Sequence, residues 1–252
     1  MFTVTAHLLH TGVANPGGIG RALVHAFLGA GYAVGAVDIA PLSDHDAALV
    51  AARDRKSFQF RCADVSKEDV VSEAVRGIML ELCCSSVSVL VNNAALADPF
   101  LNGSTVAERL ASWRRFMDVN LTGPFIMSEV VTEHMKPGAS IIHISSTRAH
   151  QSEPGTEGYA ASKAGLCGMT HSQAVSLSPK GIRVNCILPG WIDTGGYPVS
   201  DADASFHCVG RVGIPADIAN IAVHLADSAL SGFITGQEFV VDGGVSKKMI
   251  YP

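Results

Sequence analysis

The stretch "TGVANPGGIG", Thr11 to Gly20, joins a short apolar run to a segment with helical periodicity. A glycine-rich turn between a strand and a helix is typical of sites that hold the phosphates of a dinucleotide. Gly18 and Gly20 would let the backbone approach such a ligand closely, with the positive end of the helix facing it. The same turn also occurs without any ligand, so this stretch alone leaves both interpretations open.

The segment after the turn has the spacing of an amphipathic helix, and Gly31 is suited to end it. Its apolar positions are Ile19, Ala22, Leu23, Ala26, Phe27 and Ala30.

Short runs that are apolar throughout alternate with helical segments along the rest of the chain. Such runs indicate parallel strands that helices cover on both faces. We therefore predict an α/β fold, a Rossmann-like doubly wound parallel sheet of about seven strands, in a single domain over residues 1–252. The predicted strands are Val4–Leu9, Tyr32–Asp38, Ser57–Ala63, Val87–Asn92, Ser140–Ser145, Ile182–Leu188 and Glu238–Val241; the later helices are Lys67–Leu82, Ala111–His134, Gly158–Ser178 and Pro215–Ser228.

Composition excludes several classes of function. The 252 residues are 48% hydrophobic and 16% charged, with a net charge of −5, which gives no basic surface for nucleic acid or for an anionic membrane. No apolar run has the length of a membrane span, and the N-terminal residues lack the features of a signal peptide. We expect a cytoplasmic protein.

The six cysteines form no Cys-x-x-Cys pair, which favours buried thiols in a reducing compartment over disulfides. The ten histidines show no metal-ligand spacing, so we predict no metal site.

Acidic and amide side chains follow several predicted strands. Asp38 ends the second strand, 18 residues after Gly20, where a carboxylate can accept hydrogen bonds from the adenosine ribose. Asp64 and Val65 follow the third strand, and Asn92 and Ala94 lie in "VNNAA" at the end of the fourth. Ligands gather at this edge of open α/β sheets. Asp and Asn in such places also cap helices and form turns, and Asp64 suits either purpose.

Tyr159 and Lys163 are four residues apart in a helical segment, so they share a face. A nearby ammonium and an oxidised nicotinamide would both lower the pKa of the phenol and make it an acid/base near neutral pH. The pair alone equally fits a solvated helix face. Ser146, 13 residues before Tyr159, follows an apolar strand and can hold a substrate oxygen or cap a turn. Asn120 is unfavourable in a helix, so it indicates a distortion with a bound water, or a helix end.

Together these features resemble the short-chain dehydrogenase/reductase family over nearly the whole chain. The resemblance rests on "TG…GGIG", Asp64, "NNAA", Asn120, Ser146, "YAASK", "LPGWIDT" and "ITGQEFVVDGG". It implies that Tyr159 is the general acid/base and that Ser146 positions the carbonyl or alcohol. Lys163 would lower the pKa of Tyr159 and hold the nicotinamide ribose, and Asn120 would hold a relay water.

The resemblance also implies cofactor contacts, in the glycine loop and near the sixth strand. They fall on Gly12, Gly18 and Ile19, and on Pro189, Gly190, Ile192 and Thr194, which match the segment that receives the carboxamide end of the cofactor.

Two positions depart from the family pattern. Five residues separate Gly12 from Gly18 where the family has three, and Ala95 replaces a glycine. We expect the extra Asn15-Pro16 to bulge outward beside the adenosine ribose, with the Asn15 amide facing that ribose. The alternative is that the insertion fills the pocket.

We predict an NAD-dependent oxidoreductase that interconverts a secondary alcohol and a ketone of a small molecule. NADP is disfavoured because Asp38 would repel a 2′-phosphate. The alternatives are an NADPH-dependent 3-oxoacyl reductase and a catalytically silent nucleotide-binding protein of the same fold. Residues 191–212 should cover the substrate.

The resemblance also implies a homo-oligomer, a tetramer. Small residues of the Tyr159 helix and the apolar Met249, Ile250 and Tyr251 suit contacts between subunits, although the small residues also suit packing on the sheet.

Overall fold

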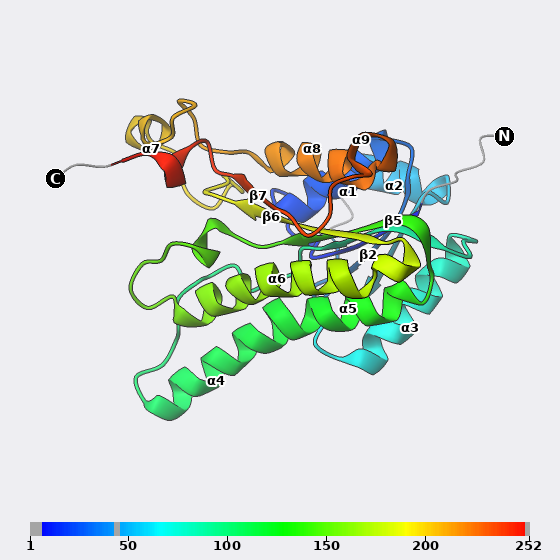
Figure 1. Cartoon of the computed structure of the whole chain (residues 1–252), viewed down its shortest axis with the longest axis horizontal. Coiled ribbons are helices and arrows are strands. Elements are labelled where there is room, and N and C mark those ends of the chain that lie inside the picture. The colour runs from blue at the N-terminus through cyan, green and yellow to red at the C-terminus, as the bar shows by residue number, and fades with distance from the viewer. Residues whose placement is uncertain (1–6, 43–45, 250–252) are drawn as a thin grey trace.

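The computed structural model describes residues 7–42 and 46–249, and it confirms the predicted parallel sheet (Figure 1). Seven strands lie in the order β3-β2-β1-β4-β5-β6-β7. They are β1 His7–Thr11, β2 Ala33–Asp38, β3 Phe58–Cys62, β4 Val87–Asn92, β5 Met135–Ile144, β6 Arg183–Pro189 and β7 Glu238–Val241. The order reverses between β1 and β4, which is where doubly wound sheets bind ligands.

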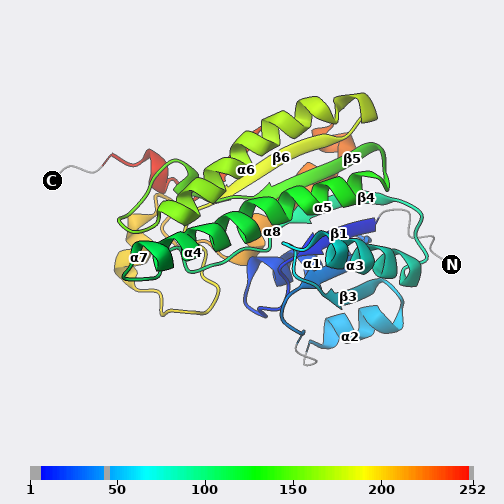
Figure 2. The same cartoon turned by 90° about the horizontal axis from the view of Figure 1, so that it is seen from below.

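Helices cover both faces of the sheet (Figures 1 and 2). The α-helices are α1 Ile19–Gly29, α2 Ala47–Asp54, α3 Glu68–Glu81, α4 Val106–Met117, α5 Gly123–Thr132, α6 Glu157–Ser176, α7 Asp201–Phe206, α8 Pro215–Ala226 and α9 Ser228–Ser231. A π-helical turn, Asp118–Thr122, separates α4 from α5, and short 3₁₀ turns lie at Thr147–Ala149, Ser178–Lys180 and Val245–Lys247.

Each face of the sheet has its own apolar core. On one face α1 and α8 pack together, α1 over β1 and β2 and α8 over β5 and β6, and the fully buried Leu23 and Phe27 of α1 lie in this core. On the other face α3 and α5 pack around Ile78, Leu90 and Val131. The two cores explain why the strands are apolar at consecutive positions, because alternate side chains enter opposite cores.

The element boundaries differ from the prediction in a few places. Of the first predicted strand, Val4, Thr5 and Ala6 lie outside the described residues, and the strand continues to Thr11. The predicted helix over Ala111–His134 begins earlier, at Val106, and the π-helical turn divides it. Sequence reasoning missed the short helices α2 and α7, whose few residues carry little periodicity.

Hydrogen bonds join the ends of β1 and β4. The Thr11 hydroxyl accepts from the backbone N–H groups of Asn93 (3.0 Å) and Ala94 (2.9 Å). The Asn93 amide donates in return to the carbonyl oxygens of Thr11 (3.1 Å) and Gly12 (2.9 Å). A side chain on Gly20 would overlap the Gly12 carbonyl, so only glycine lets α1 start this close to β1.

All six cysteines are free thiols. The prediction that they are buried is correct for Cys167 and Cys186 and wrong for Cys62, Cys83 and Cys208, which are exposed at the surface. Within the described residues, no helix combines the length and the apolar character needed to cross a membrane.

A matched pair of leucine substitutions tests the assignment of the core. Leu23 in α1 is 0% exposed, whereas Leu80 in α3 is 78% exposed. We expect Leu23→Ala to lower the free energy of unfolding by about 2–5 kcal/mol, because it leaves a cavity. Leu80→Ala should change it by less than about 0.5 kcal/mol. Urea denaturation of both variants makes the measurement, and equal losses would contradict the assignment.

Candidate active site

A cleft of about 960 Å³ opens at the carboxyl edge of the sheet. Its walls come from the glycine loop, the ends of β2, β4, β5 and β6, the start of α6 and the segment that follows β6. It brings together thirteen of the predicted site residues: Gly12, Asn15, Gly18, Ile19, Asp38, Ala94, Ser146, Tyr159, Lys163, Pro189, Gly190, Ile192 and Thr194.

The glycine loop has the form that a dinucleotide needs. Gly12 has φ +76°, and a Cβ there would lie 2.7 Å from the Ala94 Cα atom, so a side chain would close this end of the cleft. Gly18 precedes α1 without a side-chain cap, which leaves first-turn N–H groups of the helix without that partner. Such N–H groups are suited to a pyrophosphate. These residues therefore fit an NAD(P) cofactor.

The two extra residues of the loop lie on its outer side. Asn15 and Pro16 are exposed, and Asn15 also borders the cleft. The side-chain oxygen of Asn15 accepts a hydrogen bond from the N–H of Gly17 (3.1 Å), and the backbone carbonyl of Asn15 accepts one from the N–H of Gly18 (3.1 Å). The insertion is therefore a hydrogen-bonded turn, and it leaves the cleft open.

Asp38 is half-buried at the end of β2 and ties the glycine loop to this strand. One carboxylate oxygen accepts from the N–H of Ala14 (2.8 Å) and the other from the N–H of Ala40 (3.0 Å). The carboxylate borders the same cleft as Gly12 and Gly18.

Four of the predicted site residues do not line the cleft. Asp64 accepts from the N–H (2.9 Å) and hydroxyl (2.7 Å) of Ser66, so it forms the turn that the sequence left open. Val65 is buried against Gly123 at the start of α5. Asn92 and Asn120 are buried in polar clusters beneath the cleft floor.

Asn92 and Asn93 point in different directions. The Asn92 amide donates to the Nδ1 atom of His143 (3.1 Å), and the Nε2 atom of His143 lies 3.0 Å from the Gln173 amide oxygen. Asn93 borders the cleft. Consecutive residues of a strand face opposite sides of the sheet. This alternation along β4 could have shown that Asn93, and not Asn92, faces the cleft.

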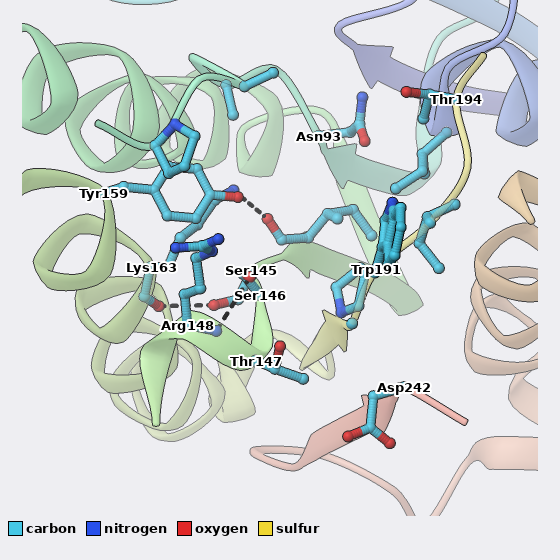
Figure 3. Close-up of a pocket in the computed structure, with 18 of the residues that line it drawn as sticks. Asn93, Ser145, Ser146, Thr147, Arg148, Tyr159, Lys163, Trp191, Thr194 and Asp242 are labelled. Atoms are coloured by element: carbon cyan, nitrogen blue, oxygen red, sulfur yellow. Dashed lines mark hydrogen bonds between the residues drawn. The ribbon is translucent and has the colours of Figure 1, made fainter. Parts of the chain in front are cut away.

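Tyr159, Ser146 and Lys163 meet on one wall of the cleft, which Figure 3 shows. Tyr159 and Lys163 are on α6, and Ser146 follows β5. The Ser146 hydroxyl lies close enough to the Tyr159 phenol to lower its pKa. The buried Lys163 ammonium donates to the Ile144 carbonyl (2.8 Å) and lies 5.6 Å from the centroid of the Tyr159 ring.

The pKa of Tyr159 depends on burial and on neighbouring groups. Burial raises this pKa, and the nearby Ser146 hydroxyl and the positive charge of Arg148 oppose the rise. The lowering by Lys163 together with an oxidised nicotinamide stays a prediction. Burial also lowers the pKa of Lys163 to about 8. An ammonium in so dry a place is costly, but with this pKa most of the Lys163 side chains stay charged near neutral pH.

Asn120 lies in the π-helical turn, which confirms that the helix is distorted there. Its side-chain oxygen accepts from the N–H of Leu96 (2.8 Å), and its amide donates to the Ser162 hydroxyl (3.3 Å). Ser162 donates to the Tyr159 carbonyl (2.7 Å). Asn120 therefore joins the loop after β4 to the helix that carries Tyr159.

Sequence reasoning missed several polar side chains in the cleft, among them Arg148 and His207. The His207 Nδ1 atom lies 2.8 Å from the Asp203 carbonyl, and its Nε2 atom is buried without a partner among the described residues. Trp191, Tyr197 and Phe206 also border the cleft, within the segment 191–212. These three residues belong to the segment that the sequence predicts to cover the substrate.

One set of described side chains has atoms close enough to share a metal ion. The ligand atoms of His150, Cys167 and Glu238 lie within 4.8 Å of one another. The His150 ring and the Glu238 carboxylate are already paired at 2.6 Å, which accounts for their approach.

The sheet order, the glycine loop at the switch point and the Ser–Tyr–Lys wall define the class: an α/β oxidoreductase built on a dinucleotide-binding fold. A family model described as Enoyl-(Acyl carrier protein) reductase matches residues 12–246. An uncharacterized oxidoreductase of Thermotoga maritima is 48% identical over 200 residues, 75% of this chain and 76% of that protein. A 3-alpha-(or 20-beta)-hydroxysteroid dehydrogenase of Mycobacterium bovis is 36% identical over 233 residues, 90% and 85% of the two chains.

The solved structure of an apo SCOR enzyme from Clostridium thermocellum has a TM-score of 0.83 at 34% identity and covers 98% of this chain and 95% of its own. The chain belongs to the short-chain dehydrogenase/reductase family. It is an oxidoreductase that acts on alcohol or ketone groups, in a family that uses NAD or NADP.

The buried cluster beneath the cleft predicts acid sensitivity. Burial lowers the pKa of His143 to about 4, from 6.5 in the unfolded chain, so the unfolded state takes up the proton first. The contribution of the neutral His143 ring to the free energy of unfolding is therefore fully present above pH 6.5 and is lost as the pH falls toward 4. We expect His143 to contribute about 3 kcal/mol to this decline.

The measurement is urea denaturation at several pH values between 7 and 4. His143→Gln should have a shallower pH dependence than the wild type, with a remainder from His10, whose pKa burial also lowers to about 4. His171→Gln is the matched control, since His171 is exposed. An unchanged slope in His143→Gln would show that this ring does not stay neutral.

Proposed function

We propose that this protein is an NAD-dependent dehydrogenase/reductase that interconverts a secondary alcohol and a ketone, with Tyr159 as general acid/base. The observation that carries the proposal is the meeting of Ser146, Tyr159 and the buried Lys163 on one wall of a cleft that the glycine loop also lines. An acid/base must lie within hydrogen-bond reach of the oxygen on which it acts, and Ser146 marks where that oxygen would bind.

In the direction of oxidation, the substrate hydroxyl would bind between the Ser146 hydroxyl and the Tyr159 phenol. The positive charges of Arg148 and of an oxidised nicotinamide would oppose the effect of burial and favour the Tyr159 phenolate, which takes the hydroxyl proton at its oxygen. Ser146 donates to the oxygen that becomes the carbonyl. The bound nicotinamide supplies the chemistry of hydride acceptance from the carbinol carbon. Lys163 would hold the nicotinamide ribose, in line with its place beside Tyr159.

Asn120 would act by holding α6 in place. It bonds both Leu96 and Ser162, so it fixes the first turns of the helix on which Tyr159 stands. The relay water that the family resemblance assigns to Asn120 would then lie at this distorted turn.

The proposed cofactor is NAD. Asp38 presents a carboxylate at the end of β2, where a 2′-phosphate on the ribose would be repelled. Asn15 borders the cleft beside it. The remaining predicted contacts would come from Ile19 and Ala94 near the phosphates, and from Pro189, Gly190, Ile192 and Thr194 at the nicotinamide end.

The substrate would lie beneath residues 191–212, whose Trp191, Tyr197 and Phe206 give an apolar wall. The related hydroxysteroid dehydrogenase acts on a secondary alcohol on an apolar body, which fits such a wall. An NADPH-dependent 3-oxoacyl reductase is the second candidate, which the Asp38 carboxylate disfavours because it would repel the 2′-phosphate of NADPH. A silent binding protein is disfavoured by the complete set of Asn120, Ser146, Tyr159 and Lys163.

We also propose a cytoplasmic homotetramer. The exposed apolar side chains of Phe233, Leu230 and Val240 favour contacts between subunits. Of the predicted C-terminal contacts, Met249 is exposed, and Ile250 and Tyr251 lie outside the described residues. The small residues of α6 serve in part within the subunit, since Gly165 packs closely against Leu121.

Tyr159→Phe tests the mechanism. The substitution removes the phenol oxygen and little volume, so kcat should fall by at least about 10²-fold while NADH affinity stays within about threefold. NADH titration and steady-state rates give the two values. Tyr32→Phe makes the same chemical change at a distant site and should keep full activity. A Tyr159→Phe variant that retained about a tenth of the rate would rule out Tyr159 as the proton carrier.

Asp38→Ala tests the cofactor. The wild type should have a higher kcat/KM with NAD(H) than with NADP(H), and the substitution should narrow this ratio at least about tenfold, since the repulsion of the 2′-phosphate is lost. Equal or better kinetics of the wild type with NADPH would contradict the proposal.

A further inference from the structure

Arg148 is a second cation beside the reacting groups, in addition to Lys163. It lies in the 3₁₀ turn Thr147–Ala149, and its backbone N–H donates to the Ser146 hydroxyl oxygen (3.2 Å). Its side chain borders the cleft, and its charge acts on the Tyr159 phenol. Figure 3 shows the guanidinium on the same wall as Tyr159, facing the cleft.

One edge of this guanidinium has a partner and the other has none. The Nη2 atom forms an ion pair with Glu153, which also borders the cleft. The Nη1 atom is buried and has no hydrogen-bond partner among the described residues. A buried charged donor without a partner costs free energy, and the Arg148 side chain is 30% exposed at the cleft, so a small shift of the guanidinium would bring Nη1 to an acceptor bound there.

The other charged groups of the cleft are already engaged. Lys163 donates to the Ile144 carbonyl. The carboxylates of Asp38 and Asp242 each accept from backbone N–H groups. His207 has its Nδ1 atom 2.8 Å from the Asp203 carbonyl, so one side of its ring is engaged. Among the described cleft residues, Arg148 therefore offers a permanent positive charge with a free donor.

We propose that Arg148 binds a carboxylate of the substrate, so that the enzyme acts on hydroxy acids and their keto acids. The guanidinium remains charged at any physiological pH, and its planar fork matches a carboxylate. Glu153 holds Nη2 and thereby fixes the direction of Nη1. This inference rests on the proposed function, because the carbinol that reacts at Tyr159 belongs to the same molecule.

Three hydroxy acids with the same secondary carbinol test the proposal: lactate, 3-hydroxybutyrate and 4-hydroxypentanoate, each beside its methyl ester. In the wild type at least one acid should exceed its ester in kcat/KM by about tenfold or more, since only the acid pairs with the guanidinium. Arg148→Gln should bring that ratio close to one. Arg148→Lys, which keeps the charge without the fork, should retain part of it.

The ratio of acid to ester separates binding from a general effect on Tyr159. Loss of the Arg148 charge slows both members of a pair through the phenol, and this common factor cancels. Arg61→Gln is the matched control, since Arg61 also pairs with a glutamate, Glu81, but outside the cleft. It should leave the ratio unchanged.

Calorimetric titration of each acid and ester into the protein with excess NADH distinguishes the failure of the carboxylate subsite from the failure of the proposed dehydrogenase function. Turnover of esters and acids at equal kcat/KM, or an acid preference that survives in Arg148→Gln, would overturn the carboxylate subsite and leave the proposed function standing. Binding of an acid that depends on Arg148, without turnover of any alcohol, would support the subsite and overturn the function. No binding and no turnover would overturn both.

Discussion

The junction between β1 and β4 is the constraint on which the rest of the site depends. The Thr11 hydroxyl and the Asn93 amide bond across it, and Gly12 and Gly20 bring the start of α1 against it. Strand order reverses here, so helices leave on opposite faces and a crevice remains between them. Any side chain on Gly20 would separate α1 from the sheet and displace the phosphate end of the cleft.

Polar groups buried beneath the cleft hold its reactive wall. Asn120 fixes the start of α6, and His143 connects Asn92 to Gln173. These side chains are buried and each makes at least one hydrogen bond, which restricts their motion, although the Asn92 Oδ1 and Gln173 Nε2 atoms have no partner among the described residues. The wall they support is dry, which raises the pKa of Tyr159 and lowers that of Lys163. Ser146 and Arg148 offset part of that cost at the phenol.

Much of this architecture was predictable from the sequence. Apolar strands, the periodicity after Gly20, and the spacing of Ser146, Tyr159 and Lys163 depend on local patterns, and the structure places them as expected at one edge. Asn92 and Asp64 show the limit, because both lie at strand ends but only the direction of the side chain decides whether it meets the cleft. Arg148 and His207 were not predictable, since their roles depend on burial and on partners distant in the chain.

The central claim is that an alcohol and a nicotinamide react directly in this one cleft. The most direct measurement uses a secondary alcohol deuterated at its carbinol carbon, with NAD⁺ and the wild-type protein, and mass spectrometry of the reduced cofactor. The account predicts one deuterium in each NADH formed and a slower reaction than with the undeuterated alcohol. Loss of the deuterium to water, or NADH that carries only hydrogen, would contradict it.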